Sequence, residues 1–308
     1  MISQIVLFFE AALISLLITY PVVAGLRFFK VRQFIRAEGP QSHYGKAGTP
    51  IMGGIGFILT ILIFVLICIN VEMDFRYMAL LFLMLGFAGI GLFDDLTKTL
   101  KKQNLGLTFW QKIILQSVFA AIFSYFLVTI GYHQQDVGEP LAYLLGSVFI
   151  IVGTANATNL TDGLNGLLAG TGSLAFVFFV LIANRLGSVD TATFALIAAG
   201  ATAAFLFYNF PKAQVFMGDT GSLAIGALLA GMAILLHQEL RLIIIGGVFV
   251  IETLSVIMQV ASNKFFKKRP FRMTPLHHHF ELLGFNEVQI VLGFWGVGLI
   301  LGIVGLLL

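Results

Sequence analysis

Ten long apolar stretches, separated by polar or Gly/Pro-rich breaks, constrain this chain more than any other feature of its sequence. A helix that crosses the hydrocarbon core of a bilayer needs about 20 mostly apolar residues. Each stretch is continuous rather than alternating, which excludes a membrane β-barrel. The sequence therefore predicts an all-α, polytopic membrane protein with about ten transmembrane helices. These helices are expected near residues 3–26, 53–71, 77–93, 110–131, 141–156, 166–184, 191–208, 221–236, 241–262 and 289–308.

The composition supports this prediction, because 58% of the residues are hydrophobic and only 11% are charged. A soluble domain carries about 25% charged residues, so this chain cannot cover a globular surface with polar groups. The fifth and eighth stretches are short enough to be tilted, broken or partly re-entrant. No linker or separate polar domain interrupts the pattern, and we expect one transmembrane domain over residues 1–308.

The uneven distribution of lysine and arginine predicts the orientation of the chain. If successive helices alternate in direction, 15 of the 18 Lys and Arg residues lie in or beside the loops that follow odd-numbered helices. Cytoplasmic loops carry the excess of positive charge, so both termini are expected on the outer side. Five polar motifs fall in these cytoplasmic loops and predict a single site on that face. The motifs lie at residues 46–54, 94–102, 156–165, 209–222 and 269–281.

The segment GLFDDLTK sets Asp94 and Asp95 at the predicted end of the third helix, with Lys98 one turn later. A surface ion pair with Lys98, contributing about 0.3 kcal/mol, is the simplest interpretation of either acid. Two adjacent carboxylates at the negative end of a helix dipole are, however, locally unfavourable. A divalent cation such as Mg2+, which binds carboxylate and phosphate oxygens together, explains them better.

The segment FMGDTGS, residues 216–222, sets Asp219 in a glycine-flanked turn before an apolar helix. An N-cap role alone would explain an Asp at this position. The same turn also suits a ligand, because Gly218 and Gly221 allow the backbone to approach a phosphate or a metal closely. Together with Asp94 and Asp95, Asp219 makes a set of three carboxylates.

The segment NATNLTDGLNG, residues 156–166, is expected to form a loop at a helix junction. Asn, Asp and Gly often serve only the backbone of an ordinary turn. Asn159 and Asp162 are three residues apart, as are Asp162 and Asn165, so one helical turn would bring these side chains together. That arrangement suits a hydroxyl-rich or nucleoside ligand.

The segment TPLHHHFE sets His277, His278 and His279 in sequence after a basic run. The simplest role of the run is to anchor the chain to anionic lipid headgroups. Neighbours on a helix point about 100° apart, so the three imidazoles cannot share one metal unless the segment is extended. Contact of one or two of them with a phosphate or a base is favoured over a zinc site. Lys46 precedes a glycine-rich segment and can hold a diphosphate as a point charge, although the P-loop spacing is absent.

The motifs GTPIMGG, DDLTK, NATNLTDGLNG, FMGDTGS and PLHHHFE resemble those of the phospho-N-acetylmuramoyl-pentapeptide-transferase family, over essentially the whole chain. The acidic motifs are similar to those of the wider polyprenyl-phosphate N-acetylhexosamine-1-phosphate transferase superfamily, and PLHHH points to the muramoyl-pentapeptide branch. The resemblance implies Mg2+-dependent transfer of phospho-MurNAc-pentapeptide from UDP-MurNAc-pentapeptide to undecaprenyl phosphate. The products would be undecaprenyl-diphospho-MurNAc-pentapeptide (lipid I), a peptidoglycan precursor, and UMP. It also implies a homodimer in the bacterial inner membrane, in contact with membrane lipid and without a nucleic-acid partner.

The resemblance also implies roles for individual residues. Asp94, Asp95, Asp219 and His277 would be catalytic. Asp219 would be the principal Mg2+ ligand, and Asp94 and Asp95 would also bind the ion. Asp94 would in addition be the base that deprotonates the lipid phosphate. Substrate contacts and support would come from Lys46, Lys98, Lys112, Gln116, Asn159, Asp162, Asn209, Phe216, His278 and His279.

Two positions depart from the family pattern, and two mechanisms stay open. Asn165 stands where the family commonly has Asp, so this position is not assigned to the metal, and Ile51 stands where it commonly has Thr. Either the lipid phosphate attacks directly after deprotonation, or Asp219 first forms a covalent phospho-sugar intermediate.

Two other functions would share parts of this pattern. A GlcNAc-1-phosphate transferase would keep the acids and change the sugar, and PLHHHFE argues against it. A secondary transporter would also have about ten helices, but its polar or broken positions should lie near the middle of the membrane. The acids of this chain instead crowd one face.

Overall fold

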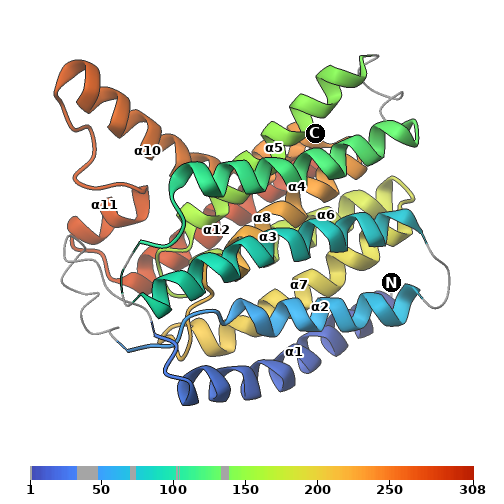
Figure 1. Ribbon diagram of the computed structural model, residues 1–308, viewed down its shortest axis with the longest axis horizontal. Helices are drawn as coiled ribbons and strands as arrows, with labels where there is room; N and C mark the ends of the chain where they lie inside the picture. The colour runs from blue at the N-terminus through green and yellow to red at the C-terminus, as the bar shows by residue number, and fades with distance from the viewer. Residues whose placement is uncertain (1, 33–47, 70–73, 102, 104, 133–138) are drawn as a thin grey trace.

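The computed structural model describes residues 2–32, 48–69, 74–101, 103, 105–132 and 139–308. Within these ranges the chain forms a bundle of helices, and the only β-type pairing is an isolated bridge between Arg32 and Pro50 (Figure 1). The helices are α1 (Ile2–Phe28), α2 (Gly54–Ile69), α3 (Phe75–Leu100), α4 (Phe109–Thr129), α5 (Pro140–Thr161), α6 (Leu167–Arg185), α7 (Val189–Asn209), α8 (Gly218–Leu235), α9 (Glu239–Ile245), α10 (Gly247–Phe266), α11 (Leu276–Leu282) and α12 (Glu287–Leu307).

Nine helices in the described part of the chain are long and apolar enough to cross a membrane, and α2 is a shorter apolar helix of 16 residues. Helices suit this environment because they satisfy their backbone polar groups internally. Each of the ten predicted stretches contains or overlaps one of these helices, so the prediction of an all-α, polytopic membrane protein is confirmed. The fifth and eighth stretches form the continuous helices α5 and α8.

The ninth apolar stretch differs from the prediction. The sequence predicts one helix over residues 241–262, whereas the chain forms α9 and α10, which meet at Gly246 and Gly247. Glycine weakens a helix, and a Cβ added at Gly246 would lie only 2.8 Å from the carbonyl oxygen of Leu242. Beyond this junction α10 leaves the bundle, as Figure 1 shows at upper left.

α8 is the central helix of the bundle. Its apolar window is 94% buried, compared with 17% for α1 and 28% for α4. Helices in a bilayer associate by close packing at small residues, because lipid is as apolar as their side chains. A Cβ added at Gly91 of α3 would lie 2.2 Å from the carbonyl oxygen of Asp219, and one at Gly226 of α8 would lie 2.3 Å from Thr158 Oγ1 of α5. The glycines therefore bring α3 and α5 directly against α8.

Two helices extend beyond their apolar stretches, which corrects the predicted ends at residues 93 and 156. α3 continues to Leu100, so Asp94 and Asp95 lie inside the helix. α5 continues to Thr161, so Asn159 lies on the helix and not in a loop. The ends of α3 and α5 and the start of α8 lie at the same end of the bundle as α11 (Figure 1).

Candidate active site

Three carboxylates meet where α3 and α8 touch. Asp94 and Asp95 come from α3, and Asp219 lies in the first turn of α8. One oxygen of each carboxylate lies within 4.8 Å of the others. Asp94 and Asp95 are fully buried, and the Asp219 side chain is 15% exposed. The structure thus brings together the acidic set that the sequence motifs suggest.

Two lysines neutralise part of this charge. The Lys98 ammonium lies 2.6 Å from Asp94 Oδ2 and 3.1 Å from Asp219 Oδ2. Lys112, from α4, lies 3.3 Å from Asp94 Oδ2 and also binds Asp219 Oδ2. The helical ion pair of Asp94 with Lys98 is therefore present, as the simplest interpretation predicts. Because both lysines also reach Asp219, that pair is one part of a network that joins three helices.

Asp95 makes a contact that the sequence does not predict. Its Oδ2 accepts hydrogen bonds from the backbone N–H of Thr220 at 3.0 Å and from the Thr220 hydroxyl at 2.9 Å. The first N–H groups of a helix have no partner within it, and the N-cap residue Met217 supplies no side-chain bond. Asp95 therefore caps α8 from a neighbouring helix. Asp219 lies inside that helix, so its interpretation as the N-cap is wrong.

Asp94 and Asp219 are each held by a further hydrogen-bond donor. The backbone N–H of Leu107 donates to Asp94 Oδ1 at 2.7 Å. The side-chain amide of Asn159 donates to Asp219 Oδ1 at 2.9 Å and to Ser222 Oγ at 2.9 Å. In both acids one oxygen is thus held by a neutral donor, and Oδ2 faces the lysines.

Asp162 follows the end of α5 and adjoins this cluster. The backbone N–H of Gly218 donates to its carboxylate. Burial, and then repulsion by Asp219 and Asp95, raise the pKa of Asp162 well above its ordinary value of 3.8, although part of the residue stays exposed. Asp162 is therefore a fourth acid, whose charge is opposed by Asp219 and Asp95.

We expect Asp162→Asn to stabilise the metal-free protein at neutral pH. The raised pKa means that the folded state binds more protons than the unfolded state above pH 3.8. The contribution of Asp162 to stability therefore falls as the pH rises toward the raised pKa, and it is not regained above it. Thermal unfolding in detergent with a chelator, followed over pH, measures the effect. A variant whose unfolding temperature follows the wild-type curve at every pH would contradict this expectation.

The three histidines have different surroundings on α11, as neighbours on a helix must. His277 is buried. His278 Nδ1 lies 2.6 Å from Glu281 Oε2, and His279 Nδ1 accepts the backbone N–H of Arg272 at 3.1 Å. The segment is helical and not extended, which agrees with the prediction that the three imidazoles do not share one metal.

Glu252 of α10 is the residue near the site to which the sequence interpretation gave no role. It is fully buried, accepts the backbone N–H of His277 at 3.2 Å, and lies 3.2 Å from His277 Nδ1. The other ring nitrogen faces Gly163, where an added Cβ would lie 2.2 Å from His277 Nε2. Glu252 therefore holds His277 beside Gly163, the residue that follows Asp162. An acid inside an apolar stretch is the signal that points to such a partner.

Asn209 and Phe216 hold the loop before α8. Asn209 is buried; its Oδ1 accepts the N–H of Gly166 at 2.6 Å, and its amide donates to the Val215 carbonyl at 2.9 Å. Phe216 exchanges backbone hydrogen bonds of 2.8 Å with Pro50 and Gly53, which joins GTPIMGG to the Asp219 turn. The Asn209 amide therefore serves the backbone. Lys46 lies outside the described residues.

The remaining motif positions support neighbouring segments. Gln116 of α4 is buried and accepts a hydrogen bond from the amide of Asn156 at 2.6 Å. Asn165 donates its backbone N–H to Glu287 at 2.7 Å and its amide to the Pro211 carbonyl at 3.1 Å. These contacts agree with leaving Asn165 outside the metal set.

The carboxylate cluster has the donor atoms that a magnesium ion prefers. Mg2+ binds oxygen ligands, and commonly one or two carboxylates together with substrate phosphates. Asp95 Oδ1 has no hydrogen-bond partner among the described residues and lies 3.7 Å from the Lys98 ammonium. With three carboxylate oxygens within 4.8 Å of one another, the residues fit a divalent cation.

Several known proteins can be aligned with this chain over nearly its full length. Residues 77–237 match glycosyl transferase family 4. The chain is 47% identical over 318 residues to a phospho-N-acetylmuramoyl-pentapeptide-transferase of Bacillus pumilus, with 99% of this chain and 98% of that protein covered. Proteins of the same name are 49% identical in Shouchella clausii, with 98% and 95% covered, and 45% identical in Bacillus subtilis, with 99% and 98% covered. The matched family range includes the three acids and both lysines of the cluster.

Proposed function

The chain belongs to the phospho-N-acetylmuramoyl-pentapeptide-transferase family, and we propose that it transfers phospho-MurNAc-pentapeptide from UDP-MurNAc-pentapeptide to undecaprenyl phosphate. The products are lipid I and UMP. As a family member the protein is a transferase of peptidoglycan biosynthesis, and its apolar helices make it a multi-pass membrane protein. The proposal includes the bacterial inner membrane, both termini outside, a cytoplasmic site, a homodimer, and one catalytic domain over residues 1–308.

The observation that carries the proposal is the set of three carboxylates and two lysines at one end of the bundle. Both substrates carry phosphate, so the reaction needs positioning and neutralisation of charge. Lys98 and Lys112 bring two positive charges that bind phosphate oxygens. Asp94, Asp95 and Asp219 would hold Mg2+, which when bound would polarise the phosphoryl group and offset its charge.

We assign the bond-forming step to the lipid phosphate itself. One of its oxygens bonds to the β-phosphorus of the nucleotide sugar, while the bond from that phosphorus to the UMP oxygen breaks. Asp94 accepts the proton of the lipid phosphate beforehand. Asp219 and Asp94 are held alike, since Lys98 and Lys112 face Oδ2 of each and a neutral donor binds Oδ1 of each. The direct route needs no covalent intermediate, and trapping a phospho-sugar adduct on Asp219 would contradict it.

The remaining residues of the site are proposed to bind the nucleotide sugar. Asp162 and Asn159 lie at the end of α5 beside the cluster, and His277 adjoins them through Gly163. Lys46, Phe216, His278 and His279 complete the proposed set of substrate contacts. Asn209 supports the loop that carries Asp219.

The test measures UMP release by the purified protein in detergent. We expect release from UDP-MurNAc-pentapeptide only when undecaprenyl phosphate and Mg2+ are both present, and we expect a chelator to stop it. Preferred turnover of UDP-GlcNAc would instead support the GlcNAc-1-phosphate transferase. Flux of substrate into proteoliposomes without UMP release would indicate a transporter.

A further inference from the structure

The turn between α5 and α6, residues 162–166, is short and is supported by groups from other parts of the chain. α5 ends at Thr161 and α6 begins at Leu167, so the chain changes direction within this turn. Gly166, the N-cap of α6, has a φ of 79°, a left-handed conformation that suits glycine, and no side-chain cap bond is made there. The buried backbone groups of such a turn need partners elsewhere.

α12 binds this turn at two successive residues. Glu287, in the first turn of α12, accepts the backbone N–H of Asn165 at 2.7 Å. Trp295, two turns further along the helix, donates its Nε1–H to the carbonyl oxygen of Gly166 at 3.1 Å. Residues at this spacing lie on the same face of a helix. The indole of Trp295 also packs directly on α6, because a Cβ added at Gly170 would lie 2.1 Å from it.

The same helix also holds α11. The Phe280 ring of α11 packs edge-to-face on Phe294 of α12, the neighbour of Trp295, with 6.2 Å between the ring centroids. His277 of α11 in turn faces Gly163 of the turn so closely that an added Cβ would lie 2.2 Å from His277 Nε2. α12 therefore holds both of the segments that meet at this contact.

We propose that Glu287 and Trp295 are positioning residues, which hold the α5–α6 turn in the conformation that binds the nucleotide sugar. The inference rests on the proposed function and adds two residues outside the substrate contacts given above. A binding side chain such as Asp162 is held accurately only when the groups around it are fixed by their own contacts. Because Glu287 and Trp295 act through the backbone of the turn, they set the affinity for the nucleotide sugar and leave the bond-forming step unchanged.

The first test removes the acceptor on α12 and then restores it. Glu287→Ala should raise the KM for UDP-MurNAc-pentapeptide roughly tenfold, the order of effect expected when a buried N–H loses its acceptor. Glu287→Gln keeps an oxygen acceptor and should restore the wild-type KM. The KM for undecaprenyl phosphate and the rate at saturation should match the wild type in both variants. Glu239→Ala, which removes an acid from the first turn of α9, is the matched control and should leave all three values unchanged.

Two results would overturn the inference. One is an unchanged nucleotide-sugar KM in Glu287→Ala, and the other is an equal rise of this KM in Glu287→Gln, which would assign the effect to the charge of Glu287. Absence of UMP release by the wild-type protein would instead overturn the proposed function.

The second test does not depend on whether Glu287→Ala folds. Trp295→Phe keeps an aromatic ring beside Gly170 and loses the N–H that donates to Gly166. We expect the KM for UDP-MurNAc-pentapeptide to rise and the KM for undecaprenyl phosphate to stay unchanged. An unchanged nucleotide-sugar KM in this variant would contradict the inference, whatever the behaviour of Glu287→Ala.

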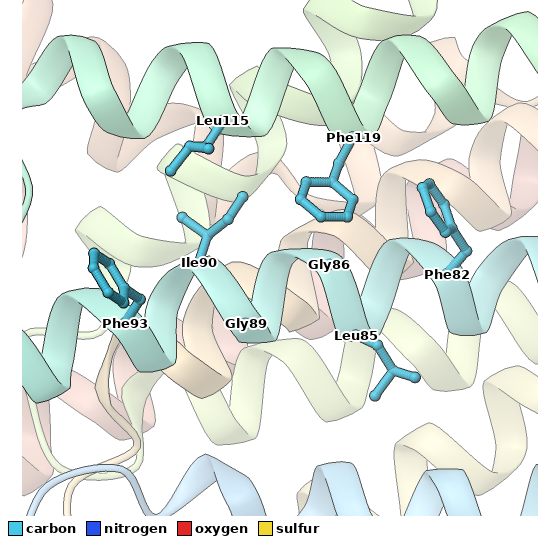
Figure 2. Close-up of a pocket in the computed structure, with 8 residues that line it drawn as sticks. All are labelled: Phe82, Leu85, Gly86, Gly89, Ile90, Phe93, Leu115 and Phe119. Carbon is cyan, nitrogen blue, oxygen red and sulfur yellow. The ribbon is translucent and has the colours of Figure 1, made fainter.

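A control on α4 separates loss of position from loss of stability. Figure 2 shows Phe119 directed from α4 toward Gly86 of α3, in an apolar pocket of about 460 Å3 lined by residues of these two helices. Phe119→Ala removes apolar contacts and should lower the unfolding temperature in detergent. The nucleotide-sugar KM should stay unchanged, because the α5–α6 turn keeps its contacts. A rise as large as that in Trp295→Phe would mean that this KM only follows stability, which would contradict the inference.

Discussion

Asp219→Asn is expected to lower the rate of UMP release by about a thousandfold, the order of effect seen when one electrostatic group is lost from a preorganised site. Asn keeps the shape of the side chain and loses the charge that faces both lysines. Lys98 and Lys112 then lose their common partner on α8, and the proposed Mg2+ loses a ligand. The rate at saturating concentrations of both substrates measures the effect.

A matched control is Asp190→Asn, which removes another partly exposed acid. Asp190 lies in the first turn of α7, 3.8 Å from the Arg76 guanidinium, and outside the cluster. We expect this variant to keep nearly the full rate. Thermal unfolding should show that both variants stay folded. Wild-type activity in Asp219→Asn would remove this residue from the site.

Gly91→Ala is expected to lower activity about a hundredfold, which is the effect of a displacement of about 1 Å in a catalytic site. The added Cβ would lie 2.2 Å from the carbonyl oxygen of Asp219 and 2.5 Å from the backbone nitrogen of Thr220. Both atoms are backbone, so no side-chain rotation relieves the contact, and α8 must move away from α3. Overpacking of this kind also destabilises a protein by about 1–3 kcal/mol. The rate of UMP release and the unfolding temperature in detergent report the two effects.

Gly153→Ala on α5 is the control for this substitution. An added Cβ at Gly153 meets no atom within 4 Å, and alanine favours a helix over glycine by up to about 1 kcal/mol. We expect this variant to be as stable as the wild type or more so, with full activity. If Gly91→Ala behaved in the same way, the close approach of α3 and α8 would not be what positions Asp219.

The helices could be predicted from the sequence because apolar length is dictated by the bilayer. The convergence of the motifs could also be predicted, since alternating helices bring every second loop to one face. The helix ends could not be predicted in the same way. Apolar length marks where the hydrocarbon ends, whereas a helix continues while its backbone hydrogen bonds have partners. α3 therefore runs on through Asp94 and Asp95 to Leu100.

The contacts between helices were the part least accessible to sequence reasoning. Asp95 caps α8 from α3, and Glu252 holds His277 from α10. Both contacts join different helices, and although an acid inside an apolar stretch signals that Glu252 has a partner, no local pattern identifies the partner of either acid. The break between α9 and α10 at two adjacent glycines could not be predicted from the sequence either. Glycines also occur within the continuous helices of this bundle, so their presence alone does not mark a break.

Lys98 and Lys112 share the oxygen Asp219 Oδ2, so in the unliganded site the charge of this carboxylate is balanced by two ammonium groups. A cation that binds this oxygen must displace the ammonium groups, and ammonium groups that turn to a phosphate must leave the carboxylates. Each ligand therefore prepares the site for the other, and thermodynamic linkage makes the effect reciprocal. A metal ion or an inorganic phosphate that binds alone would have to break the ion pairs of Asp219 with these lysines. Under the proposed function, this pairing of opposite charges would favour a metal and a phosphorylated substrate that bind together over either one alone.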